Sequence, residues 1–268
     1  MMSIKSAIKK ICFSLLLMAL IPHTNLKAQG KKVLQVGDPA PPLKYAKWIQ
    51  GANPITELKK DKLYVIEFWA TWCGPCIAAM PHLSELAKKY EGKIDFIGCD
   101  VWEHKYGGPK EQESYLSKVT KFVQDQFNLG RLTYNVIIDN NAEDMAKNWL
   151  DAAGIGGIPS SFVIADGKIA WIGHPHYIDS ILTGVINGTF DVAAERERQE
   201  ARRKKQDAQS AGYKNAMAAY KKAEEEKDFA KALQLVDSAI AKFPSNSYMF
   251  VTDKFMLLLK HVGEEKAI

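Results

Sequence analysis

The sequence predicts an α/β domain followed by an α-helical region. Apolar, strand-like runs alternate with helical patterns until about residue 190. The composition then changes abruptly to charged, helix-forming residues, and amphipathic helical patterns follow from residue 213. The chain has 268 residues, 47% of them hydrophobic, so it can bury one sizeable core and a second, smaller one.

The first 28 residues have the order of a secretory signal peptide. Lysines precede a mainly apolar run at 11–21, and the small residue Ala28 closes a more polar stretch. A transmembrane helix needs about twenty apolar residues, so this run is too short to cross a bilayer, and membrane anchoring is the less favoured alternative. We predict cleavage near Ala28 and export to the periplasm.

Cleavage changes both the charge and the cysteine count. It removes four lysines and no acidic residue, which lowers the formal charge from +5 to +1 and leaves no basic stripe. We therefore predict no nucleic-acid partner. Cys12 is also removed, and the odd number that remains fits one redox pair, Cys73 and Cys76, plus one spare thiol. The spare thiol, Cys99, lies in an apolar strand and is expected to be buried.

The α/β domain is expected to span residues 33–190, after a proline-rich entry. Its expected strands are apolar runs at 63–69, 94–101, 134–139, 160–165 and 168–172. Its expected helices have apolar residues at helical spacing and lie at 75–90, 114–127, 142–153 and 177–187. Asp166-Gly167 is a strong hairpin signal between the last two strands.

The C-terminal part of the chain is expected to be helical throughout. Residues 191–212 are mostly charged and predict a solvated helical linker. In residues 213–268, Ala232, Ala239 and Pro244 stand where a tetratricopeptide unit has small residues and a closing proline. One repeat cannot bury its own apolar face, so this region either docks on the α/β domain or belongs to a longer chain.

Cys73 and Cys76 form a Cys-x-x-Cys motif, which is typical of either half a zinc site or a redox dithiol. Zinc needs four ligands, and the sequence has neither a second such motif nor a histidine pair at finger spacing. Ile77 after the motif also excludes the haem-attachment pattern. We therefore predict a redox pair, with no metal and no cofactor beyond the Cys73–Cys76 disulfide.

The position of the motif predicts different roles for the two cysteines. Cys73 follows an apolar strand and Cys76 lies in the first turn of the next helix, where unpaired N–H groups stabilise a thiolate. We expect Cys73 to be an exposed attacking nucleophile, with its pKa lowered from about 8.5 toward about 7, and Cys76 to be the resolving thiol. Pro75 suits the first helical position, because its missing N–H would be unpaired there.

Two segments carry a resemblance to a known family. Residues 67–76 read EFWATWCGPC and residues 157–160 read GIPS. Together they resemble the thioredoxin superfamily, in particular its secreted TlpA-like branch. The resemblance covers residues 33–190 and implies a thioredoxin fold, that is, a central mixed sheet flanked by helices, with a TlpA-like insertion at 114–139.

The resemblance also implies roles for individual residues. Pro159 matches a proline preceded by a cis peptide bond, which leaves the backbone of Ile158 free to pair with an extended substrate. Glu67 matches a buried acid that accepts the proton of Cys76, and burial is expected to raise the pKa of Glu67. The remaining residues assigned to substrate binding are Trp72, Gly74 and Pro75.

The predicted function is reduction of protein disulfides in the cell envelope, with envelope proteins as substrates and an upstream thiol as electron donor. The Gly-Pro dipeptide between the cysteines favours a potential near about −270 mV over the value of about −120 mV of strong oxidants. Three alternatives stay open: a disulfide-forming oxidant or isomerase, a peroxiredoxin-like peroxidase, and a scaffold whose C-terminal helices recruit a protein partner. Against the peroxidase, Thr71 lies two residues before Cys73 instead of three.

Overall fold

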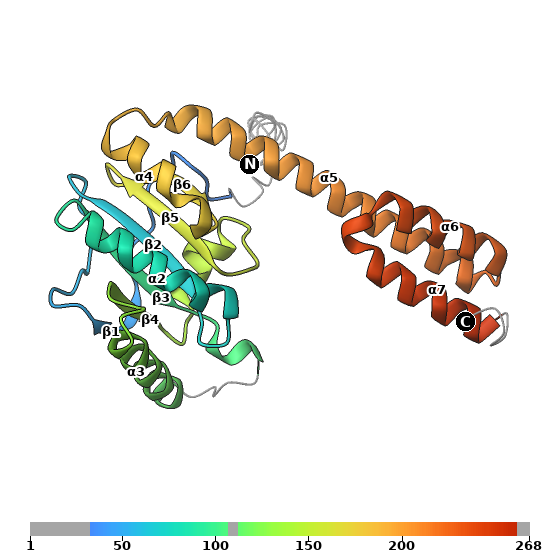
Figure 1. Ribbon diagram of the computed structural model, residues 1–268. Helices are drawn as coiled ribbons and strands as arrows, with labels where there is room; N and C mark the ends of the chain where they lie inside the picture. The colour runs from blue at the N-terminus through green and yellow to red at the C-terminus, as the bar shows by residue number, and fades with distance from the viewer. Residues whose placement is uncertain (1–32, 107–111, 262–268) are drawn as a thin grey trace, which may run out of the picture.

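The computed structural model describes residues 33–106 and 112–261 (Figure 1). The predicted signal peptide, residues 1–28, lies outside the described residues. Within them, one long helix joins an α/β domain to two further helices (Figure 1). None of the helices in the described ranges is both long and apolar enough to cross a membrane.

A six-stranded mixed sheet forms the centre of the α/β domain. Its strands are β1 (Tyr45–Gln50), β2 (Leu63–Trp69), β3 (Ile94–Asp100), β4 (Asn135–Asp139), β5 (Ser160–Ala165) and β6 (Lys168–Gly173). Their order across the sheet is β1-β4-β3-β2-β5-β6. The three central strands β2, β3 and β4 are parallel, and the other pairings are antiparallel. The five predicted strands are all present, and β1 is an additional strand that we did not predict.

β1 is absent from the sequence-based prediction because it lacks a regular strand pattern. It lies at the edge of the sheet, where only β4 pairs with it, and two register irregularities interrupt that pairing. Its side chains are mostly half-buried, with Lys47 exposed. A strand covered on so few sides needs neither an apolar run nor strict alternation.

Helices cover both faces of the sheet. α2 (Gly74–Lys89), α3 (Gln112–Asn128) and α4 (Ile178–Ile186) contribute Met80, Val119 and Leu182 to the core on one face. The opposite core contains Val36 from the N-terminal segment and Trp149 from a π-helical turn, η3 (Ala146–Asp151). The predicted mixed sheet flanked by helices is therefore confirmed.

The helix that we predicted at 142–153 is shorter and differently wound. Glu143 has a φ of 57°, which lies outside helical geometry, and the π-helical turn begins three residues later. The carboxylate of Asp139, at the end of β4, accepts hydrogen bonds from the backbone N–H groups of Met145 and Ala146, both at 2.9 Å. The helix starts where this carboxylate satisfies its free N–H groups.

α5 (Val192–Glu225) is one helix of 34 residues that passes without a break through the boundary drawn at residue 212. Its first turns bind the α/β domain (Figure 1). The N–H of Val36 donates to Oε1 of Gln199 at 2.9 Å, and Nη1 of Arg196 donates to the carbonyl of Val36 at 3.3 Å. The first turns of the charged segment therefore contact the domain and satisfy its backbone groups, which we did not expect, whereas residues 204–211 are helical and exposed.

α6 (Phe229–Lys242) and α7 (Ser247–His261) pack with the far end of α5 (Figure 1). Their shared core includes Tyr220, Ala232, Val236, Ala239, Phe250 and Leu257. The predicted α-helical C-terminal region is thus confirmed, and its assignment as a tetratricopeptide repeat stays a prediction.

Candidate active site

Cys73 and Cys76 form a disulfide where β2 leads into α2. Cys73 is the N-cap of α2, and its Sγ accepts a hydrogen bond from the backbone N–H of Cys76 at 3.3 Å. Pro75 is the second residue of α2, one position after the first helical position that we predicted for it. The sulfur of Cys73 therefore occupies the place at a helix start where N–H groups stabilise negative charge.

The disulfide is more deeply buried than we expected. Cys76 has no exposed surface, and Cys73 is only 4% exposed. The predicted exposure of Cys73 is therefore wrong for this disulfide-bonded form. The reason is that the disulfide holds Sγ of Cys73 against the buried Cys76. The carbonyl oxygen of Ile158 also lies 3.8 Å from Sγ of Cys73. Gly74 and Pro75 are exposed and form the outer surface of the motif.

The segment before β5 lies against the disulfide. The peptide bond between Ile158 and Pro159 is cis, as the resemblance implies. Pro159 is buried, and Ile158 is half-buried with its carbonyl facing Cys73. The structure thus brings Ile158 and Pro159 together with the cysteines, although they are more than eighty residues apart in the chain.

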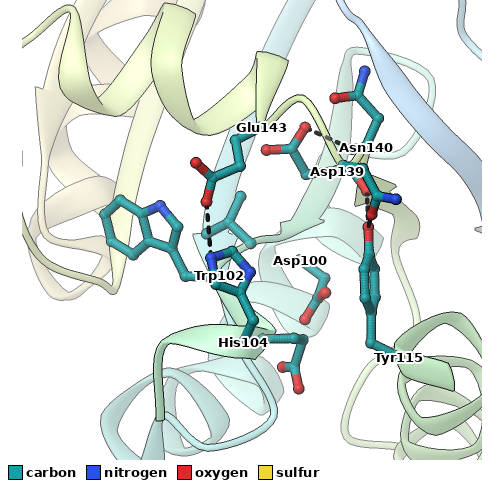
Figure 2. A pocket seen from close by; sticks show the side chains of 10 residues that line it. Asp100, Trp102, His104, Tyr115, Asp139, Asn140 and Glu143 are labelled. Carbon is teal, nitrogen blue, oxygen red and sulfur yellow. Dashed lines mark hydrogen bonds and ion pairs between the residues drawn. The ribbon is translucent and has the colours of Figure 1, made fainter. Parts of the chain in front are cut away.

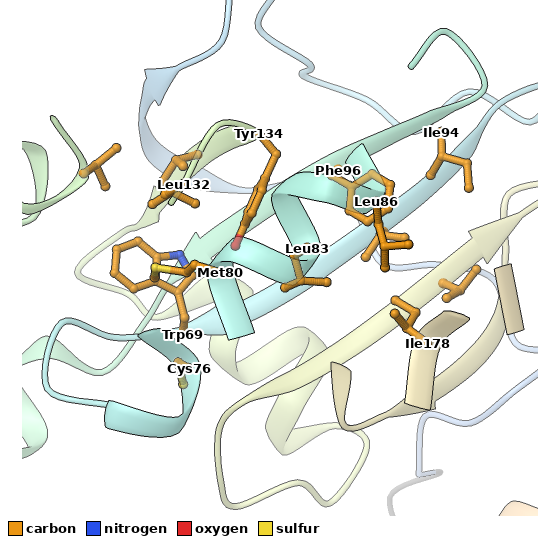
Figure 3. Packing of buried hydrophobic residues seen from close by; sticks show 14 of the residues in the cluster. Trp69, Cys76, Met80, Leu83, Leu86, Ile94, Phe96, Leu132, Tyr134 and Ile178 are labelled. Atoms are coloured by element: carbon orange, nitrogen blue, oxygen red, sulfur yellow. The ribbon is translucent and has the colours of Figure 1, made fainter. Parts of the chain in front are cut away.

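The two tryptophans before the motif have different environments. Trp69 is fully buried at one end of the cluster that also contains Cys76, Met80 and Tyr134 (Figure 3). Trp72 is half-buried, and its Nε1 donates to the carbonyl of Trp102 at 3.1 Å. This bond fixes the indole of Trp72 beside the cysteines.

Glu67 is a buried acid on the central strand. It is 1% exposed and shares a strand face with Val65 and Trp69, which belong to the same core as Cys76. Burial raises the pKa of Glu67 to about 8, although the Tyr134 hydroxyl beside it lowers the pKa. Among the described residues, Glu67 forms no hydrogen bond with Cys76, so its role as proton acceptor stays a prediction.

Sequence reasoning missed a buried carboxylate that holds the loop before the cysteines. Oε1 of Glu103 accepts from the N–H of Thr71 at 2.6 Å, and its Oε2 accepts from Oγ1 of Thr71 at 2.8 Å. Nζ of Lys118, on α3, lies 2.8 Å from the same Oε2. One feature of the sequence could have pointed to Glu103: it is a charged residue shortly after a predicted strand. Functional side chains often lie at the carboxyl ends of parallel strands.

Glu103 lines a cavity of about 400 Å³ at the carboxyl ends of β3 and β4 (Figure 2). The cavity is acidic, and Asp100, Asp139 and Glu143 also line it. Burial, and then the charge of Glu103, holds the pKa of Asp100 well above its ordinary value. His104 lies 3.2 Å from Glu143 at the rim (Figure 2). Within the part of the chain that the structure describes, no three His, Cys, Asp or Glu side chains are grouped as a metal site.

Comparison with known proteins matches this domain to one family. The thioredoxin family model matches residues 47–116. Protein FixW of Rhizobium leguminosarum is 30% identical over 159 residues, which are 59% of this chain and 68% of FixW. Thioredoxin of Staphylococcus aureus is 55% identical over 40 residues, which are 15% of this chain and 38% of that protein.

A solved structure is also similar to part of the chain. It is a thioredoxin-family thiol:disulfide interchange protein from Chlorobium tepidum, with 26% identity and a TM-score of 0.40. The match covers 56% of this chain and 96% of that one. Because the match to FixW is this extensive and the thioredoxin family model also matches, this chain belongs to the thioredoxin family.

Proposed function

We propose that this protein is an exported thiol–disulfide oxidoreductase that reduces disulfides in other proteins. One observation carries the proposal: the Cys73–Cys76 disulfide lies at the start of α2, with the N–H of Cys76 directed at Sγ of Cys73. In the reduced protein the same N–H stabilises a Cys73 thiolate, which is the form of the thiol that attacks disulfides.

The proposed reaction begins with the reduced pair. The Cys73 thiolate attacks one sulfur of a substrate disulfide, that S–S bond breaks, and the departing substrate thiolate takes up a proton. Cys76 then gives its proton to Glu67 and attacks Sγ of Cys73, which releases the second substrate thiolate. The products are a substrate dithiol and the Cys73–Cys76 disulfide, which an upstream thiol donor reduces again with two electrons and two protons.

The direction of electron flow is inferred from the motif. Gly74 and Pro75 are the dipeptide associated with reducing potentials near about −270 mV. The proposed substrates are disulfide-containing proteins of the cell envelope, reached after the predicted signal peptide is cleaved near Ala28. Amino-terminal sequencing of the protein from the periplasmic fraction tests this location, and a mature protein that still begins at Met1 contradicts it.

Insulin reduction and substrate trapping test the proposed chemistry. We expect Cys73→Ser to abolish insulin reduction, because it removes the attacking sulfur. Cys76→Ser is expected to hold substrates as mixed disulfides with Cys73, because the resolving sulfur is missing. Cys99→Ala is the matched control, since Cys99 is buried in β3 and free. Reduction by Cys73→Ser, or no mixed disulfide with Cys76→Ser, contradicts the proposal.

α7 supports a second role, the recruitment of a protein partner by the C-terminal helices. Several large apolar side chains on it are exposed: Tyr248 (82%), Met249, Val251, Phe255 and Met256. We expect Phe255→Glu, introduced into the trapping variant Cys76→Ser, to reduce the number of trapped substrates while insulin reduction in the parent protein stays normal. Ser238→Glu, on the exposed side of α6, is the control. An unchanged set of trapped substrates contradicts this role.

A further inference from the structure

We propose that Glu103 is a positioning residue, whose carboxylate holds the segment before Cys73 in the geometry that stabilises the Cys73 thiolate. This inference rests on the proposed disulfide exchange and adds a residue to it. Glu103 accepts hydrogen bonds from Thr71 and Lys118 and lies beside the carboxyl group of Asp100. Among the described residues it has no contact with the sulfurs, so it acts through the backbone of the loop.

Glu103 fixes both the position and the orientation of Thr71. One carboxylate oxygen accepts from the backbone N–H of Thr71 at 2.6 Å, and the other accepts from its hydroxyl at 2.8 Å. Hydrogen bonds to a charged acceptor are about twice as strong as neutral ones. Thr71 lies two residues before Cys73, so this double contact acts on the segment that carries the nucleophile.

The neighbours of Glu103 hold the same segment. The N–H of Val101 donates to the carbonyl of Trp69 at 2.9 Å, and Nε1 of Trp72 donates to the carbonyl of Trp102 at 3.1 Å. Residues 101–103 therefore hold residues 69–72 at three points along the chain. Of these three points, the contact with Thr71 is the one made by a charged side chain.

The burial of Glu103 indicates that this contact is built into the fold. Its side chain is 2% exposed, and a buried carboxylate without partners is strongly destabilising. Lys118 supplies the opposite charge from α3, with its Nζ 2.8 Å from the carboxylate (Figure 2 shows the cavity beside it). A charged pair in this place connects α3 to the loop before the cysteines.

The two possible effects of Glu103 on Cys73 have opposite signs. If the carboxylate positions the loop, its removal loosens the N-cap geometry and raises the pKa of the Cys73 thiol, because the thiolate loses the Cys76 N–H. If the carboxylate acted through its charge alone, its removal would lower the pKa of that thiol. The sign of the change therefore distinguishes a positioning residue from a charge.

The experiment compares Glu103→Ala and Glu103→Gln in the full-length reduced protein. The readouts are the thiolate absorbance as a function of pH and the rate of attack on a small aromatic disulfide. We expect Glu103→Ala to raise the pKa of Cys73 and to slow the reaction at neutral pH by roughly tenfold to a hundredfold, as loss of alignment does. Glu103→Gln keeps an amide oxygen for Thr71 and should retain most of the rate.

Two further variants complete the design. Glu143→Ala makes the same chemical change in the same cavity, away from Thr71, and should leave both readouts unchanged. Thr71→Val removes only the 2.8 Å bond and should slow the reaction several-fold, so it carries the test if Glu103→Ala does not fold.

Several results overturn the inference: an unchanged or lowered pKa of Cys73 in Glu103→Ala, a Glu103→Gln protein as slow as Glu103→Ala, or a Thr71→Val protein at the wild-type rate. These results would not contradict the proposed function, because they concern only the Glu103 and Thr71 variants and not the reaction of the wild-type protein. A wild-type protein whose reduced Cys73 does not react with disulfides contradicts the proposed function, and this inference with it.

Discussion

Glu67 is the residue whose chemistry depends most strongly on burial. Its pKa of about 8 means that the carboxyl group is mainly neutral at neutral pH and ionises within reach of physiological conditions. A general base works best when its pKa is near the working pH. This property suits the proposed transfer of a proton from Cys76.

The raised pKa of Glu67 predicts a pH-dependent stability. The ordinary pKa of 4.5 applies in the unfolded chain and about 8 in the folded one, so the stabilisation is fully present below pH 4.5 and is lost as the pH rises toward 8. Relative to Glu67→Gln, the wild-type free energy of unfolding should fall by up to about 1.4 kcal/mol per pH unit in this window. Urea unfolding of both oxidised proteins measures it, and parallel pH profiles contradict it.

The same pKa predicts the pH dependence of the resolving step. The rate at which Cys76 displaces substrate from a preformed mixed disulfide should rise with pH and level off above about 8, as Glu67 becomes ionised. In Glu67→Gln this inflection should disappear. Stopped-flow measurement of substrate release checks the prediction, and an unchanged inflection in the variant would assign it to another group.

Residues differ in how far the sequence alone could identify them. Cys73 and Cys76 lie in one short motif next to a strand, so their pairing could be predicted locally. Glu103 could not be found in this way, because its contact with Thr71 spans 32 residues and exists only once β2 and β3 pair side by side. The burial of Cys73 also depends on a distant segment, at Ile158.

Among the secondary-structure elements, those with strong local patterns were predictable and those set by tertiary contacts were not. β2 is buried on both faces and is apolar apart from Glu67. The Asp166-Gly167 turn has the positive φ angles of 52° and 68° that its hairpin needs. In contrast, the start of η3 depends on a side-chain contact with Asp139, at the end of the preceding strand, and β1 depends on its pairing with β4.

The cap of η3 leads to a prediction at this scale. Asp139→Ala leaves the N–H groups of Met145 and Ala146 without their acceptor, so the free energy of unfolding should fall by about 1–2 kcal/mol. Asp151→Ala, an exposed position at the other end of the same turn, is the control and should have little effect. Equal losses in the two variants would show that Asp139 does not act as a cap.

For the molecule as a whole, α5 joins two cores that have separate sets of side chains. Its first turns hold the N-terminal segment of the α/β domain through Arg196 and Gln199, and its last turns pack with α6 and α7. The α/β domain that carries the redox site therefore contacts the beginning of α5, and the redox site has no described hydrogen bond with α6 or α7. The continuity of α5 was not predicted, because the sequence pattern changes from charged to amphipathic at residue 213, inside the helix.

This arrangement predicts different outcomes for two truncations. Deleting residues 213–268 keeps Arg196 and Gln199 and should leave insulin reduction unchanged. Deleting residues 192–268 removes both side chains, uncovers the backbone of Val36, and should lower the melting temperature of the domain. Calorimetry and the insulin assay on both proteins check this. Loss of reduction in the shorter deletion would mean that the C-terminal helices belong to the redox unit.

The most direct test of the proposed reductase function is the reduction potential of the Cys73–Cys76 pair. The full-length protein is equilibrated with glutathione buffers of graded potential, and the fraction of oxidised pair is measured by thiol alkylation and mass spectrometry. We predict one two-electron transition, confined to Cys73 and Cys76, at about −270 mV. A transition above about −150 mV would contradict the reductase function, because such a pair would oxidise its partners. A transition that includes Cys99 would contradict the assignment of the redox pair to Cys73 and Cys76.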